Sequence, residues 1–240
     1  MAIVTATALG AVLAAQPATA DVVELGVTPT HILAPSCPPG LTPAKCTIVL
    51  TEVTAMETVR DAIAYPTRVK RPGRIVAFTI GLSRLSSDRK TARTYIHNLD
   101  VSYGGTAQVA ITVLRRVGPA SKLRFKVVAE SEIEHLQPYL GQVVQFPIFT
   151  SLAVRRGDVV ALTTPTWAPV LSIFQPSKQF AYRQSRTSNC SSPPTTSQAQ
   201  SVGESARYLC NYPGTRVEYS ATEVTNPVAL HPIHAGDTFR

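Results

Sequence analysis

Residues 143–174 place the strongest limits on how this chain folds. Residues 144–148 alternate between apolar and polar side chains, which is typical of a half-buried strand. A tight turn follows, in which Gly157 can adopt a positive φ and Asp158 can bond its own backbone. Residues 159–162 are apolar on both faces, as in a central strand covered on two sides. We therefore predict that this stretch forms a hairpin in the core of an all-β domain.

The exit of this stretch holds Trp167, the only tryptophan of the chain, between Pro165 and Pro169. A flat ring held by stiff neighbours is a candidate platform for the apolar face of a sugar, so Trp167 is a candidate binding residue. A tryptophan also buries a large apolar surface, which favours a place in the core. Both interpretations stay open at this point.

Other segments also show strand-like patterns, separated by turn-forming residues. These segments are residues 47–53, 74–82, 107–113, 122–127 and 215–224. Short helices are expected only at residues 56–64 and near a capping-box spacing that begins at Ser131, while residues 83–98 are expected to be a polar loop. The pattern predicts a two-sheet antiparallel β-sandwich with a jelly-roll-like arrangement.

The motif V-x-x-G-D-V-V-A-L at residues 154–162, after a strand-rich half, resembles the jelly-roll modules of secreted bacterial proteins, including carbohydrate-binding ones. The resemblance covers roughly residues 70–175 and implies a sandwich that could bind carbohydrate. No binding residue of those modules has a clear counterpart in this chain.

The first part of the chain indicates export. Residues 2–15 are apolar and uncharged, and residues 18–20 are Ala-Thr-Ala, which predicts a removable signal peptide over residues 1–20 and a secreted protein. Residues 21–46 are expected to be a proline-rich arm, residues 47–225 the sandwich domain and residues 226–240 a tail. No later segment is apolar for long enough to cross a membrane as a helix.

The four cysteines lack metal-ligand spacing, which favours disulfides in an exported chain. Three pairings are open to four cysteines. We expect the pairing that is local in sequence, Cys37 with Cys46 and Cys190 with Cys210. The second bridge would then cross a loop at residues 185–212.

The formal net charge of +8 favours anionic partners such as an acidic polysaccharide or a cell-wall polymer. Lys122, Arg124 and Lys126 alternate with apolar residues, so we expect them on one face of a strand as candidate binding residues. A merely solvated sheet face is the alternative. Few aromatic residues accompany these bases, which disfavours nucleic acid as a partner.

Three further patterns have weak chemical meaning. Ser87 and Lys90 fit the S-x-x-K spacing of penicillin-recognising enzymes, but the companion motifs are missing. His231, His234 and Asp237 could bind a metal, although exposed histidines of a tail are the simpler interpretation. Glu130, Glu132 and Glu134 could supply oxygen ligands to calcium, although the solvated N-terminus of a helix is the simpler interpretation. We therefore expect a non-catalytic binding or surface protein without a cofactor. A carbohydrate-binding module and a hydrolase with a loop-built site are the alternatives.

Overall fold

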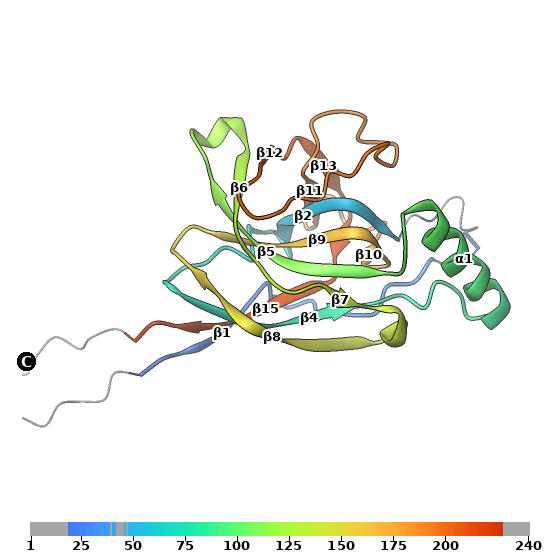
Figure 1. Cartoon of the computed structure of the whole chain (residues 1–240), viewed down its shortest axis with the longest axis horizontal. Coiled ribbons are helices and arrows are strands. Elements are labelled where there is room, and N and C mark those ends of the chain that lie inside the picture. The colour runs from blue at the N-terminus through green and yellow to red at the C-terminus, as the bar shows by residue number, and fades with distance from the viewer. Residues whose placement is uncertain (1–18, 39, 42–45, 47, 228–240) are drawn as a thin grey trace, which may run out of the picture.

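The chain folds into an all-β sandwich of antiparallel sheets (Figure 1), as predicted. The computed structural model describes residues 19–38, 40–41, 46 and 48–227. One sheet has the order β1 (Val22–Leu25), β15 (Tyr219–Thr225), β4 (Gly73–Gly81) and β8 (Val143–Val154). The expected signal peptide lies almost entirely outside the described residues.

The second sheet has nine strands and curls over the first. Its order is β12 (Ser205–Arg207), β6 (Arg124–Glu130), β5 (Gln108–Arg116), β9 (Val159–Ala168), β2 (Leu50–Arg60), β11 (Ala181–Gln184) and β13 (Cys210–Pro213), with β3 (Ile63–Ala64) beside β2 and β7 (Glu134–His135) beside β5. A separate pair joins β10 (Leu171–Ser172) to β14 (Arg216–Val217). Short 3-10 turns lie at Ala120–Lys122 and Gln137–Tyr139.

Two hydrophobic clusters lie on opposite faces of β9. Val160 and Leu162 belong to the main core between the sheets. In the same core, the Phe78 ring of β4 stacks on the Phe146 ring of β8, with 5.3 Å between the ring centroids. Val159 and Ala161, which alternate with them, belong to a second cluster. The nine-stranded sheet is therefore covered on both sides at its centre, as the apolar run at residues 159–162 predicted.

The predicted hairpin at residues 143–174 is wrong, because its two strands belong to different sheets. β8 pairs with β4, whereas β9 pairs with β2 and β5. The turn between them bonds a third segment: Gly157 N donates to Val69 O, and Val69 N donates to Asp158 O, both at 2.9 Å. The positive φ of Gly157, +94°, suits this turn. A turn of this kind carries the chain from one layer of the sandwich to the other.

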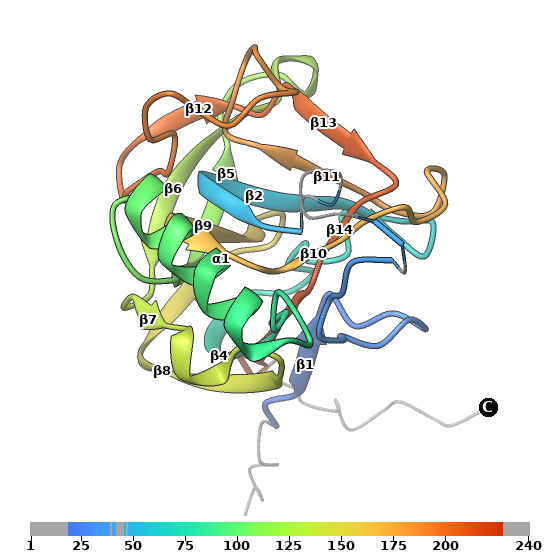
Figure 2. The same cartoon turned by 90° about the vertical axis from the view of Figure 1, so that its right-hand side faces the viewer.

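Residues 83–98 were expected to be a loop, but most of them form helix α1 (Arg89–Ser102). Asp88 caps the helix by accepting a hydrogen bond from Thr91 N at 2.8 Å. Ile96, Leu99 and Tyr103 pack against the main core from one side of the helix. Figure 2 shows α1 running across one end of the sandwich. Within the described part of the chain, no helix is both long and apolar enough to cross a membrane.

Both expected short helices are wrong. Residues 56–60 continue β2, in which Met56 is fully buried. Ser131 does not cap a helix; its Oγ accepts a hydrogen bond from Ile111 N at 2.9 Å. Because both faces of β2 are buried, its apolar and polar residues do not alternate, and the sequence pattern that predicts a strand is missing.

Candidate functional site

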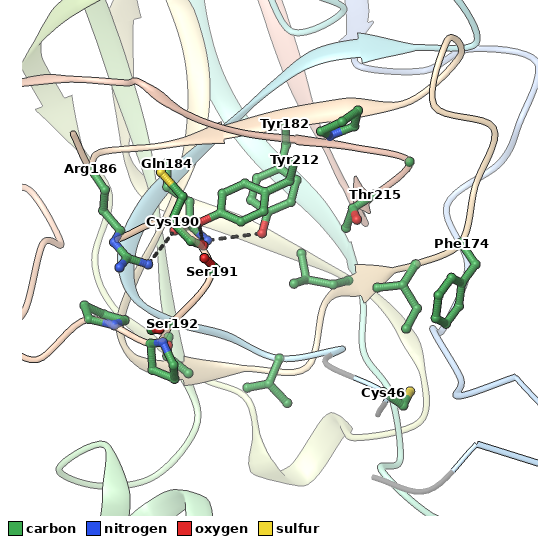
Figure 3. Close-up of a pocket in the computed structure, with 18 of the residues that line it drawn as sticks. Cys46, Phe174, Tyr182, Gln184, Arg186, Cys190, Ser191, Ser192, Tyr212 and Thr215 are labelled. Carbon is green, nitrogen blue, oxygen red and sulfur yellow. Dashed lines mark hydrogen bonds between the residues drawn. The ribbon is translucent and has the colours of Figure 1, made fainter. Parts of the chain in front are cut away.

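A cavity of about 820 Å³ lies beside β11 and β13, near the end of the sandwich that carries α1 (Figure 3). Its floor is polar and aromatic, and its far wall is apolar. The residues that line it include Val49, Thr51, Leu99, Tyr103, Leu171, Ile173, Phe174, Tyr182, Gln184, Arg186, Cys190, Ser191, Ser192, Pro193, Pro194 and Tyr212. Segments far apart in the sequence meet here.

The floor of the cavity is a pair of stacked tyrosines. Tyr182 of β11 lies directly opposite Tyr212 of β13 in the antiparallel register, and the two rings stack at 4.7 Å and 15°. Cross-strand aromatic pairs of this kind stabilise a sheet edge. The alternation along β11 also places Gln184 on the cavity side and turns Arg183 away from it, toward the carbonyl groups of Tyr208 and Leu209.

Hydrogen bonds fix the polar groups of the floor. The Tyr212 hydroxyl lies 2.9 Å from Gln184 Oε1 and 2.7 Å from the Cys190 carbonyl oxygen. Gln184 Nε2 donates to the Tyr182 hydroxyl at 3.1 Å. Burial raises the pKa of both Tyr182 and Tyr212, so both phenols stay protonated at neutral pH. They can therefore serve as hydrogen-bonding groups but not as bases.

Arg186 supplies the positive charge of the cavity. It follows β11 and is only 6% exposed. Its Nη2 donates to the Asn189 carbonyl oxygen at 2.5 Å, and its Nη1 makes a long contact of 3.4 Å with Gln184 Oε1. Among the described lining residues, Arg186 is the only charged side chain.

Both predicted disulfide pairs are present. Cys190 is bonded to Cys210 with a Cα–Cα distance of 5.2 Å, and Cys37 is bonded to Cys46 at 5.8 Å. Because Cys210 belongs to β13, the bridge between Cys190 and Cys210 holds the segment 190–194 beside the sheet as one wall of the cavity.

Phe174 lies across the cavity from Arg186 in Figure 3. Its side chain is 68% exposed, and its φ of +59° is a conformation that bulky residues rarely adopt. Exposure of a large apolar ring and a strained backbone at one position are typical of binding sites. The cavity thus has a cationic end and an aromatic end.

Trp167 does not offer an exposed platform, since its side chain is fully buried. Its indole Nε1 donates to Asp100 Oδ1 of α1 and to the Gly105 carbonyl oxygen, both at 3.0 Å. Trp167 is therefore a core residue that fastens the end of α1 to β9. The flanking Pro165 and Pro169 did not keep it at the surface, because β9 is a central strand.

The predicted basic strand is correct only in part. Arg124 and Lys126 are exposed on β6 and alternate with the buried Phe125 and Val127. Lys122 is also exposed but lies in a 3-10 turn, and Leu123 has a left-handed φ of 46°, which ends the alternation. Arg207 of β12 lies directly opposite Arg124 and extends the basic surface.

The other sequence patterns that lie within the described residues bring no metal-binding group together. Ser87 and Lys90 are exposed residues next to the Asp88 cap. Glu132 accepts a hydrogen bond from Phe149 N. In the part of the chain that the structure describes, no group of His, Cys, Asp and Glu could hold a metal ion. The pair His231 and His234, with Asp237, lies outside the described residues.

No family model matches this chain, and no curated protein or solved structure is significantly similar to it. The resemblance to jelly-roll modules of secreted proteins therefore remains an expectation, and the site rests on its own geometry.

The residues of the cavity floor were not identified from the sequence. Tyr182 and Gln184 alternate directly before Arg186, which is a strand signal of only three positions. Tyr212 is distant in sequence and joins them only through the pairing of β11 with β13. The disulfide at Cys190 and Cys210, which was predicted, is the one sequence feature that indicates this pairing.

Proposed function

We propose that this chain is a secreted, non-catalytic binding protein that holds a saccharide in the cavity beside β11 and β13. The observation that carries the proposal is the stack of Tyr182 and Tyr212 on the cavity floor, with Gln184 beside it. Two disulfides support an extracellular location, because such bonds persist in oxidising compartments.

The chemistry of the lining suits a sugar. The CH groups on one face of a pyranose pack well against an aromatic ring, while its hydroxyl groups need hydrogen-bond partners at the edges. Gln184, Ser191 and Ser192 offer such partners around the tyrosines. The volume of about 820 Å³ falls within the range of ligand cavities in proteins and has room for more than one sugar ring.

A hydrolase is the alternative function, and the lining supports it less well. Glycoside hydrolysis usually requires two carboxyl groups on either side of the scissile bond. None of the described residues that line the cavity is Asp, Glu or His. The cavity therefore offers groups for binding and orientation rather than for proton transfer.

A glycan array probed with the chain lacking residues 1–20 tests the proposal. We expect a defined set of glycans to bind, and Tyr212→Ala to weaken their binding about tenfold or more, because the stacking surface is lost. Phe149→Ala is the matched control, since Phe149 is 94% exposed but lies on β8, away from the cavity. Equal binding by wild type and Tyr212→Ala would contradict the proposal.

A further inference from the structure

Arg186 differs from the other deeply buried arginines of the molecule. Arg60 Nε lies 2.7 Å from Glu57 Oε2, and Arg216 Nη2 lies 2.5 Å from Glu218 Oε2. Arg186 forms no ion pair with any described residue, although its side chain is almost as inaccessible. A buried guanidinium without an anionic partner is costly, because the desolvation of its charge is not compensated.

Among the described residues that line the two hollows beside Arg186, none carries a negative charge. A second hollow of about 360 Å³ shares Arg186, Ser192, Pro193 and Pro194 with the main cavity. Its other described lining residues are small, polar and uncharged: Thr187, Ser188, Asn189, Thr195, Thr196 and Gln198. An anion that reached Arg186 would therefore meet hydroxyl and amide groups and no repelling carboxylate.

The existing contacts of Arg186 leave room for a ligand. The contact between Nη1 and Gln184 Oε1 is long at 3.4 Å, so this hydrogen bond is weak. The guanidinium of Arg186 also lies near the Tyr212 phenol, and its charge acts against burial by lowering the pKa of that phenol. A carboxylate could accept two parallel hydrogen bonds from the guanidinium without breaking the stronger bond to Asn189.

From these observations we infer that the saccharide of this cavity is acidic and that Arg186 pairs with its carboxylate while the sugar ring lies against Tyr212. This inference rests on the proposed function and adds the chemical class of the ligand. The distance from Arg186 to Tyr212 is bridged by Gln184, so one ring and its carboxylate substituent can contact all three residues. Phe174 at the opposite end then contacts a further part of the ligand.

The test compares glycans that carry uronic or sialic acid with the same glycans as methyl esters, which are nearly identical in shape but neutral. We expect the acids to bind and each ester to bind at least about 30-fold more weakly. Arg186→Gln should cause a comparable loss for the acids and little change for the esters. Arg186→Lys should give an intermediate loss, because a lysine keeps the charge but not the planar fork.

Arg183→Gln is the matched control. Arg183 lies three residues from Arg186 and also donates to backbone carbonyl groups, but it lines neither hollow. This variant should bind acidic glycans as wild type does. Thermal unfolding of all three variants shows whether each is folded, and the comparison of acid with ester in wild type needs no variant.

The outcomes separate the two proposals. If neutral glycans bind as well as acids, and Tyr212→Ala but not Arg186→Gln abolishes binding, the carboxylate assignment is wrong and the saccharide site stands. If only sulfated glycans bind, the carboxylate assignment is also wrong. If no glycan on the array binds in a manner sensitive to Tyr212→Ala, both proposals fail.

Discussion

Asp61 ties the segment after β1 to the end of β2. Its carboxylate accepts hydrogen bonds from the Thr28 hydroxyl at 2.5 Å, the Thr30 amide at 2.8 Å and the Thr30 hydroxyl at 2.6 Å. Its own backbone has a φ of 49°, a conformation that Asp and Asn tolerate better than most residues. Burial alone would raise the pKa of Asp61, but the bonds from Thr28 and Thr30 outweigh it and hold the pKa below its ordinary value.

Asp61→Asn should therefore lower the free energy of unfolding in a pH-dependent manner. A carboxyl group whose pKa is depressed by folding stabilises the native state above its ordinary value of 3.8 and loses that effect as the pH falls through the native value. We expect a loss of about 1–3 kcal/mol at pH 7, from weakened bonds to a charged acceptor, and a much smaller loss at the acid end. Urea unfolding of both proteins across this pH range measures the difference.

The control is Asp21→Asn. Asp21 pairs with Arg71 at the surface, with both side chains about half exposed, so the change should stay within about 0.5 kcal/mol at every pH. A loss for Asp61→Asn that is the same at pH 7 and at acidic pH would show that the charge of Asp61 is not responsible.

At the scale of elements, β6 presents two different faces. Phe125 packs edge-on against Tyr208 at 5.4 Å and fixes the inner face. Arg124 and Lys126 point to solvent, and Arg207 lies beside Arg124 on β12. Like charges across neighbouring strands repel, so an anionic polymer along this face would relieve the repulsion.

Replacement of Lys122, Arg124 and Lys126 by Gln should leave the fold intact, since all three are exposed. We expect the variant to elute from a heparin column at a lower salt concentration than wild type, because fewer counterions are released on binding. A second variant with Arg89, Lys90 and Arg93 of α1 replaced by Gln has the same net charge. If both variants shift equally, heparin senses the overall charge and not this surface.

The elements also show what the sequence can predict. The alternation of basic and apolar residues predicted the strand at residues 124–127 correctly, because one face of this strand is buried and the other is exposed to solvent. It failed for residues 56–60 of β2, whose two faces are both buried. Helix α1 was missed because it is polar and has no fully buried residue, although Asp88 is a good cap.

The cavity could not be predicted in the same way. Its floor depends on the register that brings Tyr212 opposite Tyr182, and its wall depends on a disulfide across the intervening loop. Register between strands this distant is set by the packing of the whole sheet and not by any local pattern. The lack of an acidic partner for Arg186 is likewise a property of the folded surroundings.

At the scale of the whole molecule, the segment between β11 and β12 covers the face of the nine-stranded sheet that lies away from the four-stranded sheet (Figure 1). It is anchored at two places. Gln198 N donates to Glu52 O at 2.7 Å and Gln200 N donates to Thr54 Oγ1 at 3.0 Å, which holds the second half of the segment on β2. The first half is held by the bridge between Cys190 and Cys210, together with hydrogen bonds to the carbonyl oxygens of Asn189 and Cys190.

Removal of that bridge by Cys190→Ser with Cys210→Ser should have a local and a global effect. We expect the free energy of unfolding to fall by about 3 kcal/mol, because a loop of 20 residues is no longer closed in the unfolded chain. We also expect a broad-specificity protease to cleave the native protein faster within residues 187–197 and not at residues 198–200, which keep their own anchors. Mass spectrometry of the fragments locates the cuts.

In the control, Cys37→Ser with Cys46→Ser, the cleavage rate of residues 187–197 should equal that of wild type. If residues 187–197 stay as protected without the bridge as with it, contacts other than the disulfide hold the cavity wall in place.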